Sequence, residues 1–175
     1  MRYARHLDHP RGDDPPAVLF VCSGNLFRSV TAEYGLRHAL GKQATLSVGS
    51  AGTEAGETRA SPMITKLLRK RGIDAGKHAP RRLTAALLEG SGLVIAMSTD
   101  HRDFIARVFD RHVPLFKEIC YGRSEPLLDV HEAVAFWESE PVACRNYAAQ
   151  LIDEILAAMP ALVSVLEQRR SRPAR

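Results

Sequence analysis

The chain has 175 residues and a formal net charge of +4, with 45% hydrophobic and 25% charged residues. These proportions are typical of a globular protein with one hydrophobic core, and the length is short for two. The basic residues are scattered over the whole length without interleaved aromatic residues, which favours a solvated basic surface over a nucleic-acid-binding one.

The first sixteen residues contain no apolar run that could act as a signal peptide, and no unbroken apolar stretch elsewhere is long enough to cross a bilayer. We therefore expect a cytoplasmic protein without a membrane partner. Its cysteines, Cys22, Cys120 and Cys144, are too far apart for a disulfide framework or for the paired spacing of a zinc site. No metal is predicted. A monomer is favoured, although the sequence leaves the oligomeric state open.

The sequence divides into a leader, one domain and a tail. Residues 1–16 are rich in Pro, Asp, His and Arg and are expected to be disordered, because they cannot bury apolar surface. A single domain is predicted over residues 17–168. Residues 169–175 form a basic C-terminal tail.

Within the domain, short apolar runs alternate with stretches of helical periodicity. The run AVLFVC, residues 17–22, is continuous and β-branched, which is typical of a strand buried on both faces in a parallel sheet. A tight loop follows, and then a helix that Gly41 ends. Further strands are expected in TLSVGS, GLVIAM and HVPLF, and further helices over 62–70, 84–88, 100–108 and from Pro141, with Pro160 kinking or stopping the last. This alternation predicts a three-layer α/β fold with helices on both faces of a parallel sheet.

The loop after the first strand carries the chemistry. Cys22 ends that strand, and Arg28 lies six residues further on, at the start of the next helix. Parallel sheets place ligand sites at the carboxyl ends of their strands, and a loop that enters a helix N-terminus presents backbone N–H groups to an anion. These groups and Arg28 stabilise a thiolate, so Cys22 is predicted to be a nucleophile. Arg28 offers a planar fork that can bind two phosphoryl oxygens.

Three other residues of the loop have physical roles in this hypothesis. Gly24 lets the backbone turn, Asn25 tolerates a left-handed conformation, and Ser29 can donate a hydrogen bond to the thiolate. The alternative is that Cys22 is a buried structural residue and that Arg28 follows it by chance. The combination of Gly24, Asn25 and Ser29 at a strand-to-helix junction favours the functional interpretation.

The segment VLFVCSGNLFRS resembles the fingerprint of the low-molecular-weight protein tyrosine phosphatase family, in which an apolar strand is followed by Cys, any residue, Gly, Asn, two residues, Arg and Ser. The segments SVGSAGT at 47–53, RGID and KHAPRRLT within 71–84, and GLVIAM at 92–97 are similar to the family in order and spacing. The resemblance implies a four-stranded parallel sheet. It also implies hydrolysis of a phosphate monoester through a phosphocysteine, without a cofactor.

By the same resemblance, Cys22 is the nucleophile and Arg28 clamps the phosphate. Backbone amides of the loop would also bind the phosphate, and they belong to Ser23, Gly24, Asn25, Leu26, Phe27 and Arg28. A network of hydrogen bonds in the family supports the loop, and its matching residues are Asn25, Ser29, Ser50 and His78. Without the resemblance, Ser50 and His78 are also compatible with ordinary polar residues of a loop.

The general acid is the least defined member of the site. The family uses the Asp of an Asp-Pro pair after the last strand, and no Asp-Pro pair occurs in that region here. Asp129 and Glu125 are the candidates, and Asp129 is favoured because the longer glutamate would alter the reach needed for proton transfer. Either could instead be a plain surface acid. Asp129 also stands where it could cap a short helix that runs to Trp137.

Protein phosphotyrosine is the favoured substrate. Leu26 lies where phosphoarginine-selective relatives carry Thr, and an apolar side chain there favours an aryl phosphate, although the sequence does not separate phosphotyrosine from phosphoarginine or a small phosphate ester. Two rival functions are considered. A thiol-dependent arsenate reductase of the same fold requires two more cysteines near the helix after the central strand, where this chain has none. A phosphate-binding regulatory pseudoenzyme would keep the loop without a competent acid.

Overall fold

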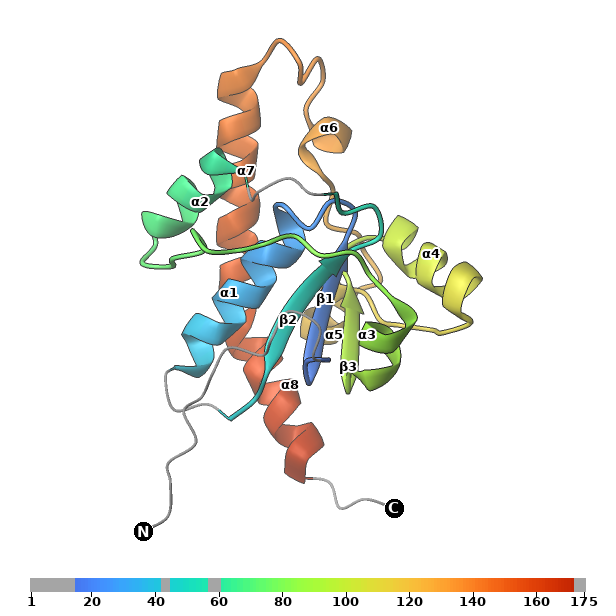
Figure 1. The fold of residues 1–175 in the computed structure, drawn as a ribbon. Helices are drawn as coiled ribbons and strands as arrows, with labels where there is room; N and C mark the ends of the chain where they lie inside the picture. Colours follow the sequence, from blue (N-terminus) through green and yellow to red (C-terminus); the bar gives the residue numbers. More distant parts are fainter. Residues whose placement is uncertain (1–14, 42–44, 57–60, 172–175) are drawn as a thin grey trace.

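The computed structural model describes residues 15–41, 45–56 and 61–171 (Figure 1). Its central sheet has three parallel strands in the order β2-β1-β3. These strands are β1 (Val18–Cys22), β2 (Val48–Gly52) and β3 (Leu93–Ala96). The helices are α1 (Arg28–Leu40), α2 (Pro62–Arg69), α3 (Ala85–Gly90), α4 (Thr99–Phe109), α5 (Phe116–Tyr121), α6 (Val130–Ala133), α7 (Pro141–Ala157) and α8 (Met159–Ser171).

The two faces of β1 account for the two layers of helices. Successive side chains of a strand point to opposite faces of the sheet. Val18, Phe20 and Cys22 pack in one core cluster with residues of α1, α7 and α8, whereas Leu19 and Val21 pack in a second cluster with residues of α3 and α4. Figure 1 shows these two groups of helices on opposite sides of the sheet. The predicted three-layer α/β fold is confirmed.

The expected fourth strand is reduced to a single parallel bridge between Ala96 and Leu115. The backbone N–H of Ala96 donates to Pro114 O at 3.0 Å, but Pro114 has no N–H of its own. The N–H of Leu115 donates to the Glu118 side chain at 3.2 Å and so caps α5, a helix that the sequence did not predict. The sheet therefore has three strands, because α5 begins where the fourth would have continued.

The C-terminal helix is interrupted as predicted. Its first part, α7, ends at Ala157, and α8 starts at Met159, so Pro160 falls in the first turn of α8, where a missing N–H is tolerated. By length and composition alone, the segment Pro141–Ser171 could cross a membrane. Core helices of soluble proteins pass the same test, and α7 and α8 supply buried residues to the core. The absence of a membrane partner stays a prediction.

Most of the predicted leader lies outside the described residues, and so do residues 172–175 of the predicted tail. Pro16 is buried and lies against Gly49, at the edge of the domain. At the other end, α8 continues through Ser171, so the first residues of the predicted tail are helical. The domain boundaries drawn from the sequence stay predictions.

Candidate active site

The loop that follows β1 lies at the carboxyl edge of the sheet, as its sequence predicts. Cys22 is the last residue of β1 and is buried, and Arg28 is the first residue of α1. The residue that follows β2 holds the start of the loop in place, since Thr53 N donates to Cys22 O at 2.9 Å. A Cβ at Gly52 would lie 2.4 Å from Ser23 O, so only glycine allows the strand to approach this closely.

The loop holds a concentration of unpaired hydrogen-bond donors. Among the described residues, nothing accepts a hydrogen bond from the backbone N–H groups of residues 23–27. The N-cap of α1, Phe27, makes no side-chain capping bond. The Nε of the buried Arg28 also has no partner within the described residues. Because buried donors in proteins are almost always paired, this cluster is suited to bind an anion that carries several acceptor oxygens.

The sulfur of Cys22 is connected to the interior by a short chain of hydrogen bonds. Its Sγ lies 3.0 Å from Ser29 Oγ, and Ser29 Oγ in turn accepts from Asn25 Nδ2 at 3.0 Å. A thiolate can only accept a hydrogen bond, so the Ser29 hydroxyl hydrogen is available for the sulfur. The contact that the sequence predicted between Ser29 and Cys22 is present in the geometry.

Asn25 is fully buried and holds the loop in a left-handed turn, with φ of 55°. Its Oδ1 accepts from Arg81 N at 3.0 Å, and its Nδ2 also donates to Ser50 Oγ at 2.7 Å. His78 Nε2 donates to the carbonyl of Asn25 at 3.0 Å. Ser50 Oγ donates to the buried carboxyl of Glu33, whose pKa is raised by burial even though Arg37 lies beside it. The predicted supporting residues therefore meet around Asn25.

Two residues of the loop behave differently from Asn25. The left-handed residue of the loop is Asn25, as predicted, and Gly24 lies in a bend without a positive φ. A Cβ at Gly24 would lie 3.3 Å from Leu26 Cδ1, which shows that the half-buried Leu26 side chain lies against this glycine. Leu26 thus covers part of the loop with an apolar surface.

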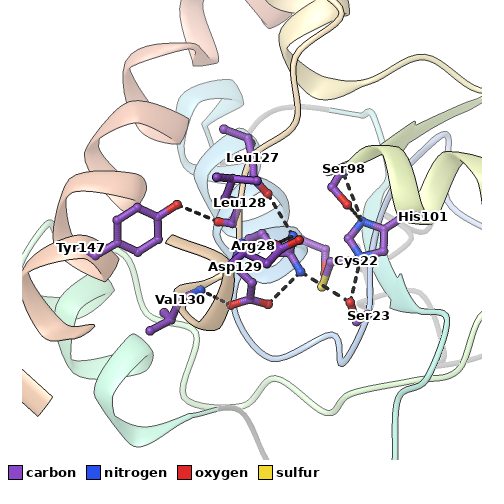
Figure 2. Close-up of polar contacts among 12 residues, drawn as sticks. Cys22, Ser23, Arg28, Ser98, His101, Leu127, Leu128, Asp129, Val130 and Tyr147 are labelled. Atoms are coloured by element: carbon purple, nitrogen blue, oxygen red, sulfur yellow. Dashed lines mark hydrogen bonds and ion pairs between the residues drawn. The ribbon is translucent and has the colours of Figure 1, made fainter. Parts of the chain in front are cut away.

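The guanidinium of Arg28 connects the loop to a distant segment of the chain (Figure 2). Its Nη2 donates to Asp129 Oδ2 at 2.7 Å, and its Nη1 donates to Leu127 O at 2.9 Å. Only 2% of the Arg28 side chain is exposed, against 26% for Asp129. Glu132 adds a second carboxylate 3.6 Å from Nη1.

The structure separates the two candidates for the general acid. Asp129 is the N-cap of α6, where its side chain accepts from Val130 N at 2.7 Å while the Glu132 side chain accepts from Asp129 N. This capping box aims the Asp129 carboxylate at Arg28. Glu125 is half exposed and instead lies 3.8 Å from both Lys117 and Arg123. Asp129 joins the site and Glu125 does not.

Two residues at the carboxyl end of β3 were missed by the sequence analysis. Ser23 Oγ lies 2.8 Å from His101 Nε2, and Ser98 N donates to His101 Nδ1 at 3.1 Å (Figure 2). The topological rule that ligands bind at the carboxyl ends of parallel strands would have indicated both Ser98 and His101. No set of three or more metal-ligating side chains occurs in residues 15–41, 45–56 and 61–171.

Comparison with known proteins agrees with this geometry. The family model for low molecular weight phosphotyrosine protein phosphatase matches residues 17–171. A protein-arginine-phosphatase of Bacillus subtilis (strain 168) is 33% identical over 117 residues, which cover 64% of this chain and 77% of that protein. The probable low molecular weight protein-tyrosine-phosphatase AmsI of Erwinia amylovora is 29% identical over 92 residues, or 53% of this chain and 62% of AmsI.

Solved structures lead to the same family. A mutant of the YwlE arginine phosphatase with a phosphorylated active-site serine superposes with a TM-score of 0.74 at 26% identity, covering 89% of this chain and 97% of that one. These relatives favour a phosphatase over both an arsenate reductase and a phosphate-binding pseudoenzyme. This chain belongs to the low molecular weight phosphotyrosine protein phosphatase family and is a thiol-based phosphatase.

Proposed function

We propose that this chain dephosphorylates protein phosphotyrosine through a phosphocysteine on Cys22. The observation that carries the proposal is the position of the Cys22 sulfur, which ends β1 beside five unpaired loop amides and the buried guanidinium of Arg28. Amides and a guanidinium that are fixed in place stabilise the charge of a transferring phosphoryl group without reorganising.

In the first step, the Cys22 thiolate attacks phosphorus in line with the leaving oxygen. An S–P bond forms as the P–O bond to the substrate breaks, and a protonated Asp129 gives its proton to the departing oxygen. Arg28 Nη2 exchanges Asp129 for an oxygen of the phosphoryl group, and the unpaired Nε donates to a second oxygen. Nη1 keeps its bond to Leu127 O and so holds the guanidinium in register.

In the second step, a water molecule attacks the phosphocysteine. The Asp129 carboxylate now accepts a proton from this water, the S–P bond breaks, and inorganic phosphate leaves as the Cys22 thiolate is restored. The Ser29 hydroxyl, 3.0 Å from the sulfur, stabilises the thiolate as a leaving group. One carboxylate therefore acts first as acid and then as base.

The choice of phosphotyrosine rests on Leu26. Its apolar side chain lies against Gly24 at the loop, where it can pack on the ring of an aryl phosphate. The second candidate is protein phosphoarginine, which the similarity to a protein-arginine-phosphatase favours. The guanidinium group of phosphoarginine is polar, whereas the phenyl ring of phosphotyrosine is apolar. Phosphoarginine therefore favours a polar residue at position 26, and phosphotyrosine favours an apolar one.

The kcat/KM values for matched phosphotyrosine, phosphoarginine and phosphoserine peptides test this proposal. We expect the wild type to prefer phosphotyrosine, and Leu26→Thr to shift the ratio of kcat/KM toward phosphoarginine by about tenfold, the size of one lost apolar contact. Cys22→Ser should abolish turnover of every substrate. Undiminished activity of Cys22→Ser would end the proposal, and a wild-type preference for phosphoarginine would replace the substrate class while leaving the thiol chemistry in place.

The cellular setting is also part of the proposal. Cys22, Cys120 and Cys144 are all free thiols in the structure, which supports a reducing compartment such as the cytoplasm. A monomer without a membrane or nucleic-acid partner is proposed on the composition of the chain alone. Fractionation of cells and analytical ultracentrifugation would test these two statements.

A further inference from the structure

The Ser23 hydroxyl occupies a position beside the reactive groups of the site. Its Oγ lies 2.8 Å from His101 Nε2 and 3.5 Å from Arg28 Nη2. Figure 2 shows the hydroxyl beside the Cys22 sulfur, with dashed lines that join it to the Arg28 guanidinium and to the His101 ring. Ser23 thus contacts both Arg28, the predicted phosphate-binding residue, and His101 of α4.

The hydrogen-bond partners of His101 define its tautomer. A backbone N–H can only donate, so the bond from Ser98 N to His101 Nδ1 makes Nδ1 an acceptor. A neutral ring then carries its hydrogen on Nε2, which donates to Ser23 Oγ. Burial and the nearby Arg28 lower the pKa of His101 to about 3, so the ring stays neutral at physiological pH.

Both contacts of the Ser23 oxygen are therefore with donors. A hydroxyl has two lone pairs and one hydrogen, and here His101 Nε2–H and Arg28 Nη2–H face the lone pairs. No acceptor for the Ser23 hydrogen is present in the described part of the chain. The hydrogen of the Ser23 hydroxyl is therefore free to donate to an anion that binds next to Arg28.

We infer that the Ser23 hydroxyl donates a hydrogen bond to an oxygen of the phosphoryl group held by Arg28 and the loop amides, and that His101 is the positioning residue that orients it. This inference rests on the proposed function and adds a side-chain donor to a site otherwise built from backbone amides and one guanidinium. It also gives the loop a link to α4, since His101 belongs to the capping box at the start of that helix.

Binding of tungstate, a stable phosphate analogue, measures this donor directly. Titration calorimetry should show that Ser23→Ala weakens binding by roughly 10- to 100-fold, as for a lost hydrogen bond to a charged group. Ser23→Thr, which retains the hydroxyl, should recover a large part of that loss. The exposed Ser164, in the middle of α8, supplies the control, and Ser164→Ala should leave the dissociation constant unchanged.

A pair of substitutions at His101 separates positioning from a purely structural role. The amide of Gln reaches where His101 Nε2 lies and can donate to Ser23, whereas the shorter Asn can replace only Nδ1 and its bond with Ser98. We expect His101→Gln to bind tungstate more tightly than His101→Asn. The double variant Ser23→Ala/His101→Asn should bind no more weakly than Ser23→Ala alone, because His101 acts through Ser23.

Two results would overturn the inference. One is tungstate binding by Ser23→Ala that equals the wild type, and the other is a His101→Asn variant that binds better than His101→Gln. Calorimetry needs no turnover, so the inference is tested even if the wild type fails to hydrolyse any phosphate ester. If Cys22→Ser abolishes turnover while Ser23→Ala binds tungstate normally, the phosphatase proposal stands and this inference alone fails.

Discussion

The floor and the rim of the site are built in different ways. The floor, defined here as Cys22 to Ser29 with Ser50 and His78, is largely buried, and Asn25, Ser29 and Ser50 are joined by hydrogen bonds. The rim, defined as residues 125–140 with α6, is largely exposed, with Phe136 at 82% and Trp137 at 46%. One region of the site is a packed interior and the other is a surface segment.

This difference indicates which properties each region can change. In a buried polar network, replacing one member leaves the hydrogen-bond partner of that member unpaired. Substitutions in the floor are therefore costly, and the geometry of the anion-binding loop is fixed. Hydrogen bonds attach the rim to the domain: Arg28 donates to Leu127 O and to Asp129, and Tyr147 Oη donates to Leu128 O at 2.8 Å. We infer that the floor supplies the chemistry common to the family, whereas the rim can vary the acid and the fit to the substrate.

A rim variant should alter activity without altering stability, and this is the largest effect we expect. Asp129→Asn keeps a good N-cap for α6 but cannot donate a carboxyl proton, so kcat should fall by about 10²–10⁴-fold for an aryl phosphate with a basic leaving oxygen. The loss should shrink for a nitrophenyl ester, whose leaving oxygen needs no proton. Steady-state kinetics with both esters measure the two losses.

Glu125→Gln is the matched control for this experiment, since Glu125 contacts Lys117 and Arg123 and not Arg28. Its kcat should stay within about twofold of the wild type. A larger loss in Glu125→Gln than in Asp129→Asn would reassign the acid.

A floor variant should alter stability and activity together. Asn25→Ala leaves Arg81 N without its acceptor and places alanine at a φ of 55°, so the free energy of unfolding should drop by about 3 kcal/mol. Urea denaturation measures this change. Asn146→Ala, on the exposed face of α7, should change stability by less than about 0.5 kcal/mol. An Asn25→Ala variant as stable as Asn146→Ala would contradict the distinction between floor and rim.

The smallest effect concerns the dependence of stability on pH. The pKa of His101 is about 3 in the fold and about 6.5 in the unfolded chain, so between these values only the unfolded chain binds the proton. Stability contributed by the neutral ring is present above pH 6.5 and is lost as the pH falls toward 3.

The slope of unfolding free energy against pH tests this point. His101→Gln should lower the slope between about pH 4 and 6 by up to about 1.4 kcal/mol per pH unit. Equal slopes in the wild type and His101→Gln would show that His101 is protonated in the fold.

The sequence predicted what local patterns encode. The apolar run before Cys22, the short loop and the helix that starts at Arg28 are contiguous, so their chemistry is visible in twelve residues. The left-handed conformation at Asn25 was predicted from residue type, and the break before Pro160 from the missing N–H. These features depend on near neighbours along the chain.

Contacts between distant segments escaped prediction unless the family resemblance supplied them, as it did for Ser50 and His78 around Asn25. The bond from Ser23 to His101 spans 78 residues, and the bond from Asn25 to the Arg81 backbone spans 56. Neither has a local signature, because a histidine or a backbone N–H becomes informative only once the sheet has brought the strand ends together. The fourth strand failed for a related reason, since the capping of α5 by Glu118 competes for the N–H of Leu115.

Rapid-quench trapping of the enzyme during turnover tests the central claim most directly. Asp129→Ala mixed with an activated aryl phosphate and quenched in acid should carry one phosphoryl group, and peptide mapping by mass spectrometry should locate it on Cys22. Phosphate found on any other residue, or an unmodified enzyme during active turnover, would contradict the phosphocysteine mechanism.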